Sequence, residues 1–255
     1  MFYDWKPYVR VADRRRQAAR EMAKLRKKGQ TVSPVVVEGR QIAGTFWGRA
    51  WCDNLERYGD YANRLPRGRT YVRNGSVVDL QIAPGKVAAI VSGSELYRVA
   101  VKVAALPAPR WSALRRDCAG EIDSLVELLQ GRFSTGVMER LCQEKTGMFP
   151  APKEIDFDCS CPDWASMCKH VAATLYGVGA RLDGKPELLF TLRQVDGSEL
   201  VAAASGRALG KRGPSRGRVL ETDGLSELFG LELDSPPATP TAAGARKGRR
   251  RGPKG

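Results

Sequence analysis

Four residues in one short stretch carry side chains that bind transition metals readily. Cys159, Cys161, Cys168 and His170 lie within twelve positions, and His170 is the one histidine of the 255-residue sequence. Zinc binds thiolate sulfur and imidazole nitrogen in tetrahedral geometry, and four protein ligands complete a structural site. The residue types and their number therefore predict a Zn²⁺ site made by these four side chains.

Two different elements must position the ligands. Residues 153–158 alternate polar and apolar side chains like a strand, and on a strand Cys159 and Cys161 would face the same side. Within a helix, Cys168 and His170 would point about 200° apart. We therefore expect Cys168 just before a helix and His170 in its first turn. A helix after His170 is predicted by the spacing of Val171, Leu175, Val178 and Leu182, and its end by Gly184 and Pro186.

Other uses of these cysteines fit the sequence less well. A disulfide between Cys159 and Cys161 would join poorly placed residues, and six cysteines are few for a disulfide scaffold of this length. A redox pair usually has the spacing Cys-x-x-Cys, which is absent. Three further cysteines stand alone in apolar helical contexts, which predicts buried core thiols: Cys52, Cys118 and Cys142.

The pattern Cys-x-Cys, a short spacer and Cys-x-His resembles the SWIM-type zinc finger, and "CPDW" and the apolar helix after His170 share the resemblance. The stretch from "FWGRAWCDNLERY" to "YRVAVKV" also resembles standalone bacterial SWIM proteins, with less specific motifs. The resemblance implies binding to DNA or to proteins, and a role as accessory to Snf-type DNA-dependent ATPases. The chain itself lacks the Gly-x-x-x-x-Gly-Lys-[Ser/Thr] phosphate loop of such ATPases.

The sequence argues against an enzyme. A catalytic zinc keeps one coordination position open, whereas four protein ligands would fill this one. Using His170 as a ligand also removes the commonest general base. Asp156 and Asp158 leave open a Mg²⁺-dependent nuclease, although two aspartates on a strand are more typical of a solvated face.

The net charge of +14 favours anionic partners, nucleic acid first. Residues 204–255 contain 11 basic and 5 acidic residues, so an excess of positive charge remains outside this segment. No apolar run is long enough to span a membrane, and the N-terminus lacks the apolar core of a secretion signal. We expect a cytoplasmic protein that binds no membrane and no small-molecule substrate. The expected phosphate contacts are Arg14, Arg15, Arg16, Lys24, Lys27, Lys28, Lys169, Arg249, Arg250 and Arg251.

The predicted fold class is α+β, with four parts in chain order. Residues 1–30 form a basic helical arm with little apolar surface, and residues 31–148 an α+β domain. In that domain Trp47, Trp51 and Leu55 share one helical face, and four strands between about 70 and 103 form an antiparallel meander with a hairpin at Asn74-Gly75. Residues 149–193 form the zinc module, a two-strand knuckle plus a helix. Residues 204–255 form a disordered basic tail with an apolar island at 223–234.

Two functions of different kinds follow from these features. The first is a nucleic-acid-binding zinc protein, with DNA favoured over RNA, whose basic residues contact phosphates. The alternative is a protein adapter that docks a partner such as a Snf-type ATPase. The leucine-rich island favours the adapter, because a purely electrostatic tail needs no such segment, although docking of the island onto its own core is slightly favoured over docking on a partner.

Overall fold

The computed structural model describes residues 10–57, 64–163, 165 and 167–202. A four-stranded antiparallel sheet has the order β1-β2-β3-β4, and helices cover it, so the predicted α+β class is confirmed. The strands are β1 (Val77–Ala83), β2 (Lys86–Ser92), β3 (Leu96–Val103) and β4 (Ile155–Cys159). The tail at 204–255, with its island, lies outside the described residues.

The predicted meander is partly wrong. Residues 70–73 belong to helix α3 (Leu65–Arg73), and Asn74-Gly75 ends this helix instead of turning a hairpin. The amide of Gly75 donates to the carbonyl of Val72 and that of Ser76 to Tyr71, which is a Schellman motif with Gly75 at φ +67°. An Asn-Gly pair suits a helix end and a hairpin alike, because both need a positive φ. The first hairpin turns at Pro84-Gly85, two residues between the paired Ala83 and Lys86.

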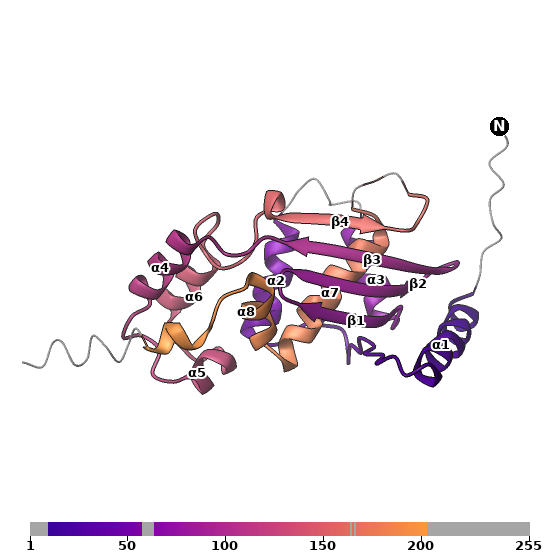
Figure 1. The fold of residues 1–255 in the computed structure, drawn as a ribbon, viewed down its shortest axis with the longest axis horizontal. Coiled ribbons are helices and arrows are strands. Elements are labelled where there is room, and N and C mark those ends of the chain that lie inside the picture. Colours follow the sequence, from indigo (N-terminus) through magenta and orange to yellow (C-terminus); the bar gives the residue numbers. More distant parts are fainter. Residues whose placement is uncertain (1–9, 58–63, 164, 166, 203–255) are drawn as a thin grey trace, which may run out of the picture. The chain divides into compact units, whose positions relative to one another are not determined.

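Strand β4 joins the sheet from far along the chain. It pairs with β3 over Val99–Val103, and the chain between them contains the helices α4 (Ala108–Asp117), α5 (Leu125–Gln130) and α6 (Thr135–Cys142). Figure 1 shows these three helices beyond one end of the sheet, on the side away from α1 (Val11–Lys27). The expected boundary between 31–148 and 149–193 therefore runs through a sheet to which both segments contribute strands.

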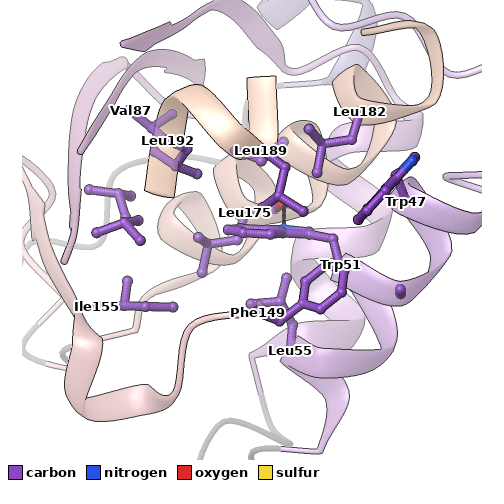
Figure 2. Packing of buried hydrophobic residues seen from close by; sticks show 14 of the residues in the cluster. Trp47, Trp51, Leu55, Val87, Phe149, Ile155, Leu175, Leu182, Leu189 and Leu192 are labelled. Atoms are coloured by element: carbon purple, nitrogen blue, oxygen red, sulfur yellow. Dashed lines mark hydrogen bonds between the residues drawn. The ribbon is translucent and has the colours of Figure 1, made fainter. Parts of the chain in front are cut away.

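The core lies between one face of the sheet and helix α7 (Lys169–Gly184), against which α2 (Phe46–Glu56) and α3 pack. Trp47, Trp51 and Leu55 are fully buried, as their spacing predicted (Figure 2). The indole Nε1 of Trp51 donates to the carbonyl of Leu175, 2.8 Å away, so the largest side chain of the core also satisfies its polar atom. Gly68 brings α3 close to α7, because a Cβ there would lie 2.5 Å from that of Ala172.

Helix α1 lies against the opposite face of the sheet. Ala18 and Met22 are buried there with Val78, and Leu25 packs beside them. The helix expected within the basic arm at residues 1–30 is present, but the expectation that this arm has little apolar surface was wrong. Its apolar residues are few, and the dense arginines around them obscure their spacing in the sequence.

A buried ion network joins the helical part to the sheet. Arg193 of α8 (Glu187–Arg193) has no exposed surface; it donates to the carbonyl of Ala104 at 2.7 Å and lies 3.4 Å from Glu154. Arg110 of α4 contacts the same carboxylate at 3.1 Å. Glu154 belongs to the short 3-10 helix η2 (Pro152–Glu154) that leads into β4. Two guanidinium groups on one carboxylate leave none of these charges buried alone.

Among the described residues, no helix is both long and apolar enough to cross a membrane.

Candidate metal centre

The four predicted ligands converge at one place in the structure. Their ligand atoms, three Sγ and one imidazole nitrogen, all lie within 4.8 Å of one another. His170 Nδ1 is 3.9 Å from Cys159 Sγ and 3.8 Å from Cys168 Sγ. In the described part of the chain this is the only group of three or more His, Cys, Asp or Glu side chains close enough to hold a metal ion. All six cysteines are free thiols.

The local structure explains why the four side chains meet. Cys159 is the last residue of β4, and Cys161 follows in the bend after it, so the strand ends two residues earlier than the same-face argument assumed. Cys168 is the N-cap of α7, and its sulfur accepts from the amide of Val171 at 3.5 Å. His170 is in the first turn of α7, as the spacing predicted, and the residue is 3% exposed. The α7 helix ends at Gly184, again as expected.

These distances fit a tetrahedral zinc ion. With Zn–S of about 2.3 Å and Zn–N of about 2.0 Å, tetrahedral angles place sulfur and nitrogen about 3.6 Å apart and two sulfurs about 3.8 Å apart. The two Sγ–Nδ1 distances exceed the first value by only a few tenths of an ångström. His170 Nδ1 faces the sulfurs, so it is the nitrogen that would bind the ion. Cys159, Cys168 and His170 are therefore within a few tenths of an ångström of such a geometry, whereas the full set of four ligand atoms spans up to 4.8 Å and would draw closer around an ion.

Aromatic rings enclose the histidine. The ring of Tyr97 stacks on His170 with centroids 4.2 Å apart, and Tyr71 meets it edge-on at 5.5 Å. Gly93 also lies against the imidazole, since a Cβ there would be 3.0 Å from His170 Nε2. Nε2 is buried and has no hydrogen-bond partner among the described residues. Packing on the ring, and not a hydrogen bond to Nε2, therefore fixes the imidazole in its orientation.

In the protein without metal, Cys168 is the residue of the cluster that carries the negative charge. The hydrogen bond from the Cys159 thiol lowers the pKa of Cys168 to about 3, and His170 and the Val171 amide act in the same direction. The pKa of Cys159 is raised because its thiol donates to Cys168, and burial raises that of Cys161. Lys169, which follows Cys168 in the chain, lies with Nζ 5.7 Å from the centroid of the Tyr71 ring.

The isolated cysteines differ from the cluster. Burial raises the pKa of Cys52 to about 12 and that of Cys118 and Cys142 to about 11. Cys118 is fully buried, and Cys52 and Cys142 pack against the core at its margin, which agrees with the predicted core role.

Alkylation should therefore distinguish the two groups of thiols. At pH 8, removing the metal with a chelator should raise iodoacetamide labelling of the peptide that holds Cys159, Cys161 and Cys168 by about tenfold, because a metal-bound thiolate is protected. At a temperature where circular dichroism shows the metal-free chain still folded, Cys52 and Cys142 should react equally slowly with and without chelator. Peptide mass spectrometry measures both, and cluster labelling that ignores the chelator would argue against a bound metal.

The residues expected to contact phosphate fall into three places. Arg14, Arg15, Arg16, Lys24 and Lys27 lie on α1, whose seventeen residues include seven basic and two acidic ones, and Lys28 caps its end. Arg16 pairs with Asp13 at 2.5 Å and Lys24 with Glu21 at 2.6 Å, so part of this charge is locally neutralised. Lys169 lies between two members of the cluster, Cys168 and His170, whereas the described basic residues of α1 lie on the other face of the sheet. Arg249, Arg250, Arg251 and the side chain of Arg14 lie outside the described residues, as does Trp164.

Asp156 and Asp158 both lie exposed on the outer face of β4. Asp156 is 3.8 Å from Lys102 across the strand pair. Asp156 and Asp158 therefore lie on a solvated strand face, which is the alternative that the sequence favoured.

Sequence reasoning missed the surroundings of the histidine. Tyr71 was placed in a strand and is on α3, whereas Tyr97 and Gly93 received no role. A glycine between two polar turn residues at the end of β2 was the available signal for Gly93. No sequence pattern relates Tyr71 or Tyr97 to His170, since the three come from α3, β3 and α7.

The fold and the cluster define an α+β protein with a Cys₃His group that could hold a metal ion. The chain is 32% identical, over 214 residues, to the uncharacterized protein Rv2102 of Mycobacterium tuberculosis; the match covers 79% of this chain and 77% of that protein. The chain belongs to the same family as Rv2102. No protein-family model and no solved structure matches it.

Proposed function

We propose that the protein is a SWIM-type zinc protein that binds nucleic acid, with DNA as the preferred partner, and that it is not an enzyme. The convergence of Cys159, Cys161, Cys168 and His170, whose ligand atoms all lie within 4.8 Å of one another, supports the zinc ion. Four protein ligands leave no coordination position for an activated water, so the ion has a structural role.

The distribution of charge supports the nucleic-acid partner. Helix α1 is rich in basic residues, and its apolar stripe fixes it on the sheet, so these charges are carried by an ordered surface. Ordered lysines and arginines contact phosphates and release counterions, which gives affinity with little sequence readout. An adapter role is the second candidate, because α5 exposes two neighbouring apolar side chains, Leu125 (43%) and Val126 (62%).

Two variants of equal charge change test the proposal in the full-length, zinc-loaded chain. Lys24→Gln/Lys27→Gln/Lys28→Gln removes three charges from α1 and its cap, and Arg249→Gln/Arg250→Gln/Arg251→Gln removes three from the tail. Duplex DNA affinity is measured against salt concentration. The α1 variant should reduce the slope of log affinity against log salt by about 2 to 3, because each lost phosphate contact changes it by about 0.9.

The tail variant is the matched control. If it alone reduces the slope, the tail binds DNA and the folded part does not. Absent or salt-insensitive binding of the unmodified chain would contradict the proposed function and leave the adapter.

A further inference from the structure

A cleft of about 210 Å³ lies between α1 and the end of α3. Arg15 and Ala18 of α1 line one side, Thr70 and Tyr71 of α3 another, and Ser76 and Ser92 the sheet side. Ala18 and Ser92 are buried, at 3% and 5% exposure, and close its inner end. The cleft is a built feature of the fold, because the packing of α1 onto the sheet creates it.

The lining offers one cation, several uncharged polar groups and one aromatic ring. Arg15 donates from Nε to the carbonyl of Asn74 at 2.9 Å, which holds its guanidinium against the turn after α3. The hydroxyl of Thr70 donates to the carbonyl of Pro66 at 3.1 Å, so its oxygen is placed to accept. The described lining contains no acidic side chain. Such a set suits an anionic ligand that also carries a flat polar ring.

Tyr71 connects this cleft to the metal centre. Its ring meets His170 edge-on at 5.5 Å, and Nζ of Lys169 lies 5.7 Å from its centroid. Tyr71 also lines the cleft and is partly exposed. His170 thus helps to hold in place a ring that Lys169 of α7 also contacts, and Arg15 of α1 lines the same cleft as Tyr71.

We propose that this cleft receives one unpaired nucleotide of a single-stranded nucleic acid, with the base against Tyr71 and the adjoining phosphates near Arg15 and Lys169. Aromatic rings beside basic grooves bind single strands because every base has a face that can stack. A duplex keeps its bases stacked inside, and a cleft of this volume admits no double helix. The inference rests on the proposed function and specifies the strandedness of its ligand.

The test uses the full-length, zinc-loaded chain at one salt concentration, with a 16-nucleotide oligothymidylate and a 16-base-pair duplex as probes. Tyr71→Leu keeps an apolar contact with His170 and removes the aromatic face, and Tyr71→Phe restores that face. Arg15→Gln removes the cleft's charge, and Arg132→Gln, an exposed arginine between α5 and α6, is its control. Fluorescence anisotropy gives the affinities. A probe with one 2-aminopurine reports stacking, and zinc content and circular dichroism report folding.

Tyr71→Leu should weaken oligothymidylate binding about tenfold and duplex binding less than twofold, because one stacking contact is lost. Tyr71→Phe should retain affinity and quench 2-aminopurine like the unmodified chain. Arg15→Gln should weaken single-strand binding more than Arg132→Gln does.

Equal losses for both probes, or unchanged binding in both Tyr71→Leu and Arg15→Gln, would overturn the inference and leave the proposed function standing. If the Tyr71→Leu variant loses its zinc or its fold, the comparison of Arg15→Gln with Arg132→Gln tests the inference instead, and equal single-strand affinities of these two variants would overturn it. If the unmodified chain binds neither probe, the proposed function and the inference both fail.

Discussion

Replacing Cys168 with serine should reduce bound zinc from one equivalent per chain to a small fraction and lower the melting temperature by about 10 °C or more. Serine is a good N-cap, so it keeps the cap of α7 while removing a thiolate ligand. Any loss of stability therefore reports the metal and not the helix end. Zinc is counted by elemental mass spectrometry, and unfolding is followed by circular dichroism.

The expected effect is large because the ion would join two parts of the core. Structural zinc contributes about 10–16 kcal/mol of apparent binding free energy in zinc-finger peptides, and that energy becomes folding energy where the site exists only in the folded chain. Here the cluster connects the end of β4 to the start of α7, which is the central helix.

Cys142→Ser is the matched control for this experiment. It removes a thiol that packs beside the core and belongs to no cluster, so zinc content should stay at one equivalent. If Cys168→Ser melts like the unmodified chain and a chelator changes neither, the cluster holds no structural metal.

Trp51→Ala should cost about 3–5 kcal/mol of unfolding free energy, the usual range for a large aromatic removed from a core. Trp51 has no exposed surface and lies between α2 and α7 (Figure 2). Its loss leaves a cavity and deprives the Leu175 carbonyl of the indole donor at 2.8 Å. Urea unfolding of the zinc-loaded protein measures the change.

Val126→Ala provides the comparison for the tryptophan variant. Val126 is 62% exposed, so its truncation should change stability by no more than about 0.5 kcal/mol. A Trp51→Ala variant as stable as Val126→Ala would mean that the α2–α7 packing does not hold the core together.

Cys168→Ser and Trp51→Ala both act on the packing around helix α7. Helix α7 and its N-cap carry two of the four residues that could hold a metal ion, and one turn and more later the helix contacts Trp51. Gly68 allows α3 to approach this helix closely, which places Tyr71 beside His170. The metal centre thus depends on core packing, and the core depends on the segment that the metal would tie down.

Local patterns in the sequence predicted the structure correctly where it depends on residues that are close together in the chain. The limits of α7, the position of Cys168 before it and the buried face of α2 all follow from helical spacing and end signals, because a helix bonds to itself. Pro109 shows how such a signal can mislead: proline usually breaks a helix, yet Pro109 lies in the first turn of α4, where proline costs no hydrogen bond.

What the sequence by itself determined is therefore the ligand set, the α+β class and the helices next to the ligands. Only the tertiary structure decided that β4 pairs with β3, that α1 lies on the outer face of the sheet through Ala18 and Met22, and that two tyrosines enclose His170. The physical reason is that these contacts join residues tens of positions apart. Their partners are selected by the shape and burial of the whole core, which no local spacing encodes.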